Sequence, residues 1–556
     1  MSITTKQSDN RKETGDEETE IGVVVSNDIG QTMHVTNIEI KRGLKSRHSQ
    51  MIAIGGTIGT GLFVGSGQAL NLGGPLFLLL GYSLLTILVF CVITGTTEFT
   101  SYLPVPGSSV AYFGNRFCSR SMGFALGWMY YYIFAITVPS EITAAALVLE
   151  YWDTPVPVAG WITIFLVVIV ALNYFPVQVY GETEFWFASI KIIGIIGLFI
   201  MSLVITYRGG PRHEAIGFAY WHNPGPMNEY IATGAIGRLV AFVVTLRFSV
   251  YVFAFAPELL VVTAGEMQQP RKNLPTAGRR FFIRLVIFYI LGAFFMGLII
   301  PSNDNQLLGA SSGASASPWA IAAKNAGISG LDSVINVVIL LTAWSAGNSW
   351  LYLASRTLYS MAGYGIAPRI FKRCTASGVP YISLAFTSMF SLLAYMNVSS
   401  STATVFNWFV NLINSGAYMS WICVCIIYIR FRKATVAQGV GKADLPYRSI
   451  FQPYASYFGG VILTLLLLLN GFTVFFNGHW ELSTFITSYI GIPIFLAFYL
   501  GHKFCVRSDR REPWCIPSVE VDLRSGLCEI EAEEESYHTR PDGKGRWYGK
   551  MRTIFE

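Results

Sequence analysis

Charged residues are scarce in this sequence, and their scarcity excludes an ordinary soluble protein. Only 13% of the 556 residues are charged, whereas soluble domains carry about 25%. A soluble chain of this length would divide into several domains with polar surfaces. The sequence is instead 52% hydrophobic, with a mean hydropathy of +0.47. Its apolar runs of about 20 residues are long enough to cross a hydrocarbon core of about 30 Å.

The sequence also lacks the patterns of an enzyme, a metalloprotein or a nucleic-acid-binding protein. It has no histidine cluster, nucleophile elbow or phosphate-binding glycine loop, and its net charge of +6 comes from short loops rather than a basic face. No cysteine falls on the side with few basic residues, so no disulfide framework is expected. Cys423 and Cys425 point to different faces of one helix, which is poor metal geometry. We expect no enzyme activity, no cofactor, no metal and no nucleic-acid partner.

Twelve apolar runs predict an all-α polytopic membrane protein embedded in a lipid bilayer. A turn at residues 71–75 separates the first two runs. We predict a cytosolic N-terminal tail over residues 1–48, without a signal peptide, a transmembrane transport domain over 49–503 and a cytosolic C-terminal tail over 504–556. The predicted spans are residues 50–71, 75–98, 122–149, 158–177, 185–206, 239–262, 280–301, 330–354, 380–397, 404–429, 456–476 and 483–502.

The basic residues of the loops predict the orientation. With the N-terminus in the cytosol, nineteen loop Lys and Arg fall inside and four outside, which is a clear positive-inside bias. An even number of spans then places both termini in the cytosol. The four outer residues are Arg208, Arg212, Arg238 and Lys324.

The first apolar run contains six glycines between residues 55 and 67, and each costs a helix up to about 1 kcal/mol. Two interpretations stay open. Small residues four apart allow close helix packing. Alternatively, Gly59, Thr60 and Gly61 form an unwound segment whose N–H groups bind a carboxylate and whose carbonyls bind an ammonium or a cation. We assign Thr57 and these three residues to a candidate substrate site.

The sixth run is also interrupted, at residues 253–258 (FAFAPE). Pro257 removes a backbone donor, so the helix must kink or break near Phe253, and Phe255 and Phe253 could gate a site there. Glu258 follows at membrane depth, where an ionisable group suggests function. Breaks in the first and sixth spans occupy corresponding positions of two five-helix halves, which is typical of an inverted-repeat transporter with two further helices. A channel is disfavoured because no repeated filter sequence is present.

Residues 42–503 resemble the fungal amino acid permeases of the amino acid–polyamine–organocation superfamily. The resemblance implies a leucine-transporter-like fold with a 5+5 inverted repeat plus two further helices, and proton-coupled uptake of an amino acid substrate across the plasma membrane by alternating access. The matching segments are residues 44–63 (LKSRHSQMIAIGGTIGTGLF), 181–187 (GETEFWF) with Lys191, 264–275 (AGEMQQPRKNLP), 301–304 (PSND), 347–349 (GNS), 355–359 (SRTLY) and 429–433 (IRFRK).

One departure from the family pattern concerns the sixth span. The family usually has Phe-Ser-Phe-x-Gly-Thr-Glu there, whereas this chain has Ala256 and Pro257 before Glu258. Proline also breaks a helix, but it is stiffer than glycine and lacks an N–H. The backbone contacts of this span, and with them the side-chain specificity, are therefore not carried over.

Five charged residues within or at the ends of spans have both a structural and a functional interpretation. Lys191 either snorkels from a helix end or, as the resemblance implies, stands beside the first-span break in place of a sodium ion and couples a proton to transport. Glu141 is either a helix-packing partner or, by resemblance, lies near the substrate amino group. Glu258 is a further candidate for the substrate site, although a structural pair is preferred over direct substrate contact. A structural pair is also preferred for Glu98, which lies near Arg116 and Arg120. Arg247 either snorkels outward or faces a vestibule and favours carboxylate-rich substrates. Asn348, Trp344 and Trp408 are weaker candidates.

Two other classes stay open: a non-transporting or dual-function amino acid sensor (transceptor), and a scaffold that acts through its tails. Related permeases are downregulated by ubiquitin ligase machinery acting on their tails. The resemblance therefore implies a ubiquitin ligase partner for the N-terminal tail, with Lys6, Lys12, Lys41 and Lys45 as acceptors.

Overall fold

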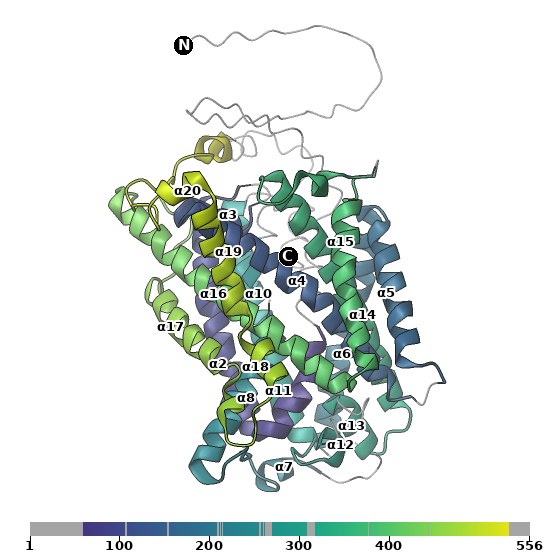
Figure 1. Cartoon of the computed structure of the whole chain (residues 1–556). Coiled ribbons are helices and arrows are strands. Elements are labelled where there is room, and N and C mark those ends of the chain that lie inside the picture. The colour runs from purple at the N-terminus through teal and green to yellow at the C-terminus, as the bar shows by residue number, and fades with distance from the viewer. Residues whose placement is uncertain are drawn as a thin grey trace, which may run out of the picture. The chain divides into compact units, whose positions relative to one another are not determined.

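The computed structural model describes residues 59–532 with short gaps, and these residues are helical or irregular, without a strand (Figure 1). The gaps are residues 106–107, 153–154, 208–210, 212, 214, 255–256, 259–260, 262–269, 309–316, 376 and 443. Thr57, Phe255 and the four tail lysines lie outside the described residues.

The helices are long where the sequence is apolar, because a backbone in lipid must satisfy its hydrogen bonds within its own segment. In chain order they are η1 (Gly61–Gly65), α2 (Ser66–Tyr102), α3 (Val110–Phe117), α4 (Arg120–Leu149), α5 (Val158–Tyr174), α6 (Val177–Thr206), α7 (Ala219–His222), α8 (Gly234–Phe253), α10 (Pro270–Leu285), η2 (Val286–Ile290), α11 (Leu291–Ile299), α12 (Asn305–Leu308), α13 (Pro318–Asn325), α14 (Leu331–Gly363), η4 (Arg369–Lys372), α15 (Tyr381–Ser391), η5 (Leu392–Val398), α16 (Thr402–Ala437), α17 (Tyr454–Leu469), η6 (Phe472–Phe475), α18 (Leu482–Tyr489), α19 (Gly491–Cys505) and α20 (Arg507–Arg511).

Gly74 divides the first long helix into two spans, as the turn at residues 71–75 predicts. Its backbone has φ 81° and ψ 173°, a non-helical conformation that glycine adopts without side-chain strain. Pro75 follows and cannot donate a backbone hydrogen bond. The loop before α8 supplies partners for the interrupted backbone: Leu76 N donates to Pro226 O at 2.9 Å, and Asn228 N donates to Gly73 O at 3.0 Å.

The described helices account for twelve spans once this division is made. Eight helices are long and apolar enough to cross a membrane, and the first of them, 42 residues from Gly61 to Tyr102, is twice the length that one crossing needs. The pair α18 and α19, bent by 44°, passes the same test together. Two shorter apolar helices, α5 and α17, complete the set. The fifth and seventh spans begin at residues 177 and 270, earlier than predicted.

Helix α4 forms the centre of the domain. It packs along α14, α16 and α3, while α2 packs along α8 (Figure 1). In its most apolar stretch 94% of the residues are buried, compared with 39% for the fifth span. Because α4 is apolar on every side and carries small residues such as Gly127 and Ala144, neighbouring helices approach it closely.

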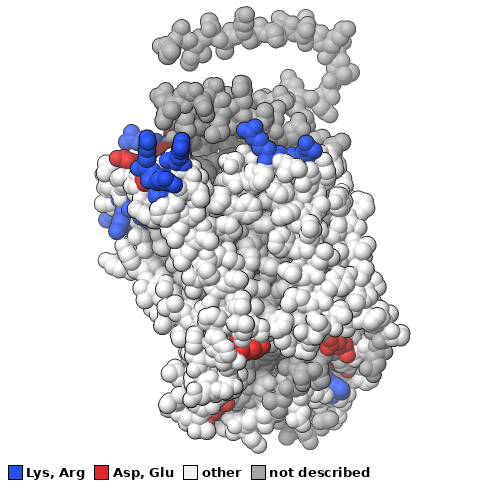
Figure 2. All heavy atoms as spheres, viewed as in Figure 1, with Lys and Arg blue, Asp and Glu red and all other residues white. Residues whose placement is uncertain are grey.

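The two ends of the described molecule differ in charge. Figure 2 shows most of the visible Lys and Arg at the end where α3 and α20 lie, Asp and Glu at both ends, and mostly uncharged side chains between them. An uncharged middle band suits contact with lipid, and the basic end is the one that the positive-inside rule would place in the cytosol.

The expected pairing of Glu98 with Arg116 or Arg120 is wrong. Glu98 is fully buried and accepts a hydrogen bond from Arg432 Nη1 at 3.1 Å, and from Ser449 N at 3.3 Å. Arg116 and Arg120 instead pair with Asp522 and Glu512 of the C-terminal segment. The structural role proposed for Glu98 stands, but its partner comes from α16, 334 residues away.

Replacing Arg432 with methionine should destabilise the protein strongly. The change leaves Glu98 buried without its cation, which costs about 3–5 kcal/mol. The double variant Glu98→Gln with Arg432→Met should recover most of that loss, because no buried charge remains. Thermal unfolding of the detergent-solubilised protein measures both effects. Equal stability of Arg432→Met and wild type would mean that the pair contributes nothing.

Candidate functional site

The first span begins its described part with a π-helical turn rather than a regular α-helix. Gly59 is a bend, and η1 covers Gly61–Gly65. Short π-helical turns are frequent at functional sites. Gly61 also brings this turn close to α8, since a Cβ added there would lie 2.9 Å from Val252 Cα. The structure therefore shows close packing at this glycine, and Gly61 itself lies in a π-helical turn rather than in an unwound segment.

Thr60, at the start of this turn, joins three helices through its hydroxyl. It donates to Glu141 Oε2 of α4 at 2.9 Å and lies 3.2 Å from the Tyr251 hydroxyl of α8. Ser140 of α4 contacts the same tyrosine hydroxyl at 3.4 Å. A Cβ added to Gly59 would lie 3.5 Å from the other Glu141 oxygen. The side chains of Thr60, Ser140, Glu141 and Tyr251 are all buried, so the start of the π-helical turn faces a buried carboxyl group.

Lys191 lies in the middle of α6 and does not reach a helix end. Its side chain is 1% exposed, and Nζ lies 3.9 Å from Glu184 Oε1. The other oxygen of Glu184 accepts a hydrogen bond from Ser345 of α14 at 3.0 Å. Lys191 also interacts electrostatically with Glu141. We name Thr60, Glu141, Glu184 and Lys191 the polar cluster.

Sequence reasoning missed Glu184 as a member of this cluster. The residue belongs to the family segment 181–187, and a signal was available: Glu184 and Lys191 are seven residues apart and so occupy one face of a helix two turns apart. The predicted fifth span began at residue 185 and therefore placed Glu184 in a loop. In the structure α6 begins at Val177, which puts both residues inside the helix.

The sixth span breaks where Pro257 predicts. Helix α8 ends at Phe253, and Ala254 has the non-helical angles φ −52° and ψ 136°. Pro257 and Glu258 are helical again, beyond two residues outside the described part. Phe253 is buried against Tyr289 and Tyr82, with ring centres 4.5 Å and 5.8 Å apart. It packs between η2 and α2 in this conformation.

Glu258 is held by side chains of two neighbouring helices. Its Oε1 accepts hydrogen bonds from Trp421 Nε1 of α16 at 3.0 Å and from the Tyr130 hydroxyl of α4 at 3.4 Å. The carboxyl group is buried, and Oε2 has no partner among the described residues. These contacts support the structural interpretation, because they fix the chain after the break to α4 and α16.

Removing the indole donor should reduce stability without much change in substrate binding. Trp421→Phe deletes one hydrogen bond to a buried carboxyl group, which costs about 1–3 kcal/mol. If Glu258 only anchors the helix, KM should stay within about twofold of wild type. Trp408→Phe, on the same helix, is the matched control. A large rise in KM with unchanged thermal stability would instead place Glu258 in contact with substrate.

The remaining polar and aromatic candidates have structural contacts. Asn348 Oδ1 accepts a hydrogen bond from Asn173 of α5 at 2.8 Å, and the ring of Trp344 lies 5.4 Å from that of Phe187. Trp408 packs partly buried against the core.

Arg247 lies half-buried on α8, with its guanidinium carbon 4.7 Å from the centre of the Phe248 ring. Its Nε has no hydrogen-bond partner within the described part of the chain. The carbonyl of Arg247 accepts a hydrogen bond from Asn414 of α16 at 2.7 Å. The ring offsets part of the positive charge, so Arg247 is the residue to test against acidic substrates.

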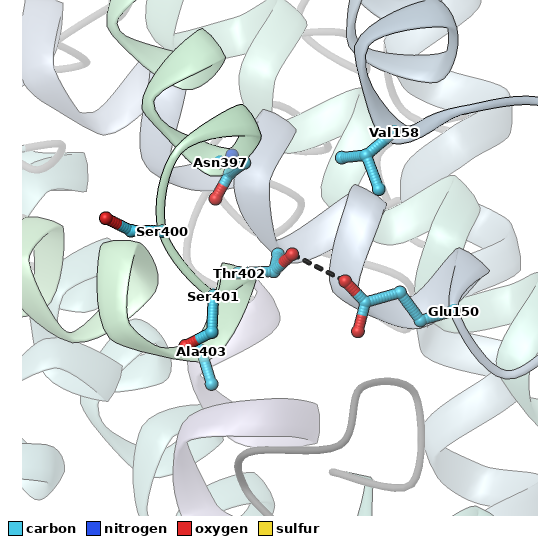
Figure 3. Close-up of a pocket in the computed structure, with 7 residues that line it drawn as sticks. All are labelled: Glu150, Val158, Asn397, Ser400, Ser401, Thr402 and Ala403. Atoms are coloured by element: carbon cyan, nitrogen blue, oxygen red, sulfur yellow. Dashed lines mark hydrogen bonds between the residues drawn. The ribbon is translucent and has the colours of Figure 1, made fainter.

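A cavity of about 270 Å³ opens away from the polar cluster, at the end of α4 opposite α3 (Figure 3). Figure 3 shows the Thr402 hydroxyl at the wall of this cavity, where it donates a hydrogen bond to the Glu150 carboxylate. None of the predicted site residues lines this cavity, so it is distinct from the candidate substrate site. Its lining residues are Glu150, Val158, Asn397, Ser400, Ser401, Thr402 and Ala403.

Twelve apolar spans, with a π-helical turn in the first, a break in the sixth and a buried polar cluster beside the first, are typical of a multi-span membrane carrier. The chain belongs to the amino acid permease family, whose model (described as "Amino acid permease") matches residues 48–514. It is 46% identical to the proline-specific permease of Emericella nidulans over 88% of this chain and 89% of that one. The chain is 42% identical to the proline-specific permease of Saccharomyces cerevisiae, over 89% of this chain and 79% of that one. The chain is also 39% identical to the dicarboxylic amino acid permease of the same yeast, over 90% of this chain and 82% of that one.

A solved mutant of the Eremococcus coleocola manganese transporter shares the fold, with a TM-score of 0.53 at 13% identity. The match covers 82% of this chain and 93% of that one. The fold is therefore leucine-transporter-like with twelve helices, as the resemblance implies. The relatives named above are permeases, so the sensor alternative gains no support from them.

Proposed function

We propose that the protein is a secondary active transporter that takes up a zwitterionic amino acid of the proline class together with a proton. The observation that carries this proposal is the polar cluster beside the first-span break. In it a buried lysine lies 3.9 Å from one carboxylate and interacts electrostatically with a second. The names of the two proline-specific relatives support the substrate class.

The charges of the polar cluster support proton coupling. With every group ionised, Glu141 and Glu184 carry two negative charges and Lys191 one positive charge, which leaves one negative charge unbalanced in a buried place. Burying an unpaired charge costs several kcal/mol or more. A zwitterionic substrate is neutral overall and does not remove the excess, whereas one proton does. Cotransport of one proton with one zwitterion is therefore the favoured stoichiometry.

The contacts of Thr60 suggest how the substrate is oriented. The ammonium group of the substrate would pair with Glu141, whose carboxylate accepts a hydrogen bond from Thr60 of the first span. Its carboxylate would meet backbone N–H groups around Gly59 and Gly61, because a break in a helix frees such donors. Lys191 would supply the positive charge that a metal cation supplies in sodium-coupled carriers.

Close packing of the two broken spans supports alternating access. The contact between Gly61 and Val252 couples η1 to α8, while α4 packs along α14. Rocking of one such pair against the other would expose the cluster first to one side and then to the other. We further propose a plasma-membrane location with both termini in the cytosol, which the charge asymmetry of Figure 2 supports.

Uptake of labelled proline by cells that lack their own proline carriers tests the proposal. We expect the initial rate to rise as external pH falls, because the proton is a co-substrate, and to persist without sodium. Competition by each of the common amino acids then defines the specificity. Stronger competition by aspartate than by proline would contradict the substrate class and favour the carboxylate-rich alternative at Arg247. A rate independent of external pH would contradict proton coupling.

Regulation through the N-terminal tail stays a proposal. Replacing Lys6, Lys12, Lys41 and Lys45 with arginine keeps the charge and removes the ubiquitin acceptors. Slower endocytosis of that variant is expected, and unchanged endocytosis would place the signal elsewhere.

A further inference from the structure

The segment after the last span folds back onto the end of the molecule that carries α3. Val521, Leu523 and Ile530 are buried there. Arg116 of α3 donates to the carbonyls of Asp522 and Ser525, each at 2.7 Å. These contacts join residues more than 400 positions apart in the sequence, so the segment is part of the folded domain.

One stretch of this segment lies directly against the turn between α3 and α4. Ile516 N donates to Cys118 O at 2.8 Å, and Arg430 of α16 donates to Ile516 O. Gln438 holds the next turn of chain through the carbonyls of Ser518 and Val521. Hydrogen bonds at the backbone N–H and at the carbonyl of Ile516 therefore fix the position of Cys515 relative to Cys118.

The two thiols are hydrogen-bond partners. Cys118 is buried and Cys515 is exposed, so a small solute reaches only the second sulfur. The thiol of Cys118 donates to the Cys515 sulfur and holds the pKa of Cys515 at about 6, below its usual range. Arg430 and Lys433 lower it further against the effect of partial burial. The same hydrogen bond, together with burial, keeps the pKa of Cys118 raised.

We propose that Cys118 and Cys515 form a peroxide-responsive thiol pair that locks the C-terminal segment to the α3–α4 turn. An accessible thiolate beside a second, protected thiol is the arrangement of a redox-sensing cysteine with its resolving partner. The inference relies on the cytosolic orientation proposed above, because a reducing compartment keeps the pair open at rest.

The reaction needs only peroxide as oxidant. The Cys515 thiolate attacks one peroxide oxygen, the O–O bond breaks, and Cys515 becomes a sulfenic acid while the departing hydroxide takes up a proton to give water. The sulfur of Cys118, as it loses its proton, then attacks the Cys515 sulfur and displaces a second hydroxide, which that proton converts to water. Two thiols and one peroxide give one disulfide and two waters. A dithiol reductant reverses the change.

Full-length protein in native membrane vesicles provides the test. After treatment with hydrogen peroxide and alkylation, mass spectrometry of a non-reducing digest should show a peptide cross-linked between Cys118 and Cys515, and dithiothreitol should remove it. Cys515→Ser should abolish the cross-link. Cys118→Ser should also abolish it, and dimedone should then label Cys515, because the sulfenic acid cannot be resolved.

Two exposed cysteines nearby in the sequence provide matched controls: Cys505, the last residue of α19, and Cys528, in the same segment as Cys515. Cys505→Ser and Cys528→Ser should leave the cross-link unchanged. Equal dimedone labelling of Cys505 and Cys515 in the Cys118→Ser variant would overturn the proposal. So would the absence of a cross-link in the peroxide-treated wild type, or a disulfide that is present before peroxide is added. Uptake by the untreated protein is measured in parallel, so failure of the thiol pair is distinguished from failure of the proposed transport function.

Discussion

Replacing Gly61 with alanine is expected to abolish most amino acid uptake while the protein still reaches the membrane. The added Cβ would lie 2.9 Å from Val252 Cα, a backbone atom that cannot rotate away, and 3.3 Å from Tyr251 Cδ1. The π-helical turn must therefore shift away from α8. Thr60 is the adjacent residue, and its contacts with Glu141 and Tyr251 would be lost with that shift. An error of about 1 Å at such a site can cost about a hundredfold in rate.

Gly65, four residues further along the same turn, provides the control. A Cβ there would meet only Tyr251 at 3.5 Å, an ordinary contact, so Gly65→Ala should transport nearly normally. Initial rates of labelled uptake, corrected for surface protein, compare the two variants. Normal transport by Gly61→Ala would mean that the glycine is not needed for the site.

Packing and substrate binding at this glycine are separated by a second measurement on the wild type. If backbone N–H groups near Gly61 bind the substrate carboxylate, amino acid amides should compete poorly with the corresponding acids. Amides that compete as well as acids would leave only the packing role.

Replacing Lys191 with methionine is expected to abolish accumulation against a gradient. A membrane potential of 100 mV adds about 2.3 kcal/mol per charge moved, which corresponds to roughly fiftyfold accumulation. Without the lysine, Glu184 loses its cation at 3.9 Å and the cluster holds two unbalanced negative charges. A proton that binds the polar cluster would then only neutralise the excess negative charge, and its binding would not be coupled to the transport cycle. The steady-state ratio of internal to external substrate measures the loss, and a Lys191→Met protein that still concentrates substrate would show that the lysine is structural.

Because Lys191→Met leaves a buried carboxylate unpaired, the variant could fail to fold. The double variant Lys191→Met with Glu184→Gln restores the net charge of the cluster and should be stable. If this folded double variant also fails to accumulate substrate, the effect belongs to coupling. If it accumulates substrate normally, the lysine is not part of the coupling mechanism.

The span pattern and both helix breaks were predictable because they depend on local chemistry. Apolar length sets the number of crossings, and the non-helical angles at Gly74 and Ala254 lie at or close to a proline, Pro75 in one case and Pro257 in the other. The partners of buried charged residues could not be predicted from local sequence, because they come from other helices. Glu98 pairs with Arg432 because α2 and α16 are neighbours in space, and no spacing within either helix carries that information.

The candidate site illustrates the same division. Thr60 and Glu141 were assigned separately, one from the glycine-rich run and one from resemblance, and only the tertiary fold brings their side-chain oxygens to 2.9 Å. Glu184 was missed because the predicted start of its helix was eight residues late, although its spacing from Lys191 was informative. Trp421 and Tyr130 could not have been assigned to Glu258, since they come from different helices.

Accumulation of labelled proline by the purified protein in liposomes tests proton-coupled transport without the other carriers of a cell. The vesicles carry an inward proton gradient and an inside-negative potential, and contain no sodium. We predict that internal proline rises above the external concentration, and that a protonophore returns the two concentrations to equality. Equilibration without accumulation under the same gradient, or accumulation that requires sodium and ignores the protonophore, would contradict proton-coupled transport by this protein.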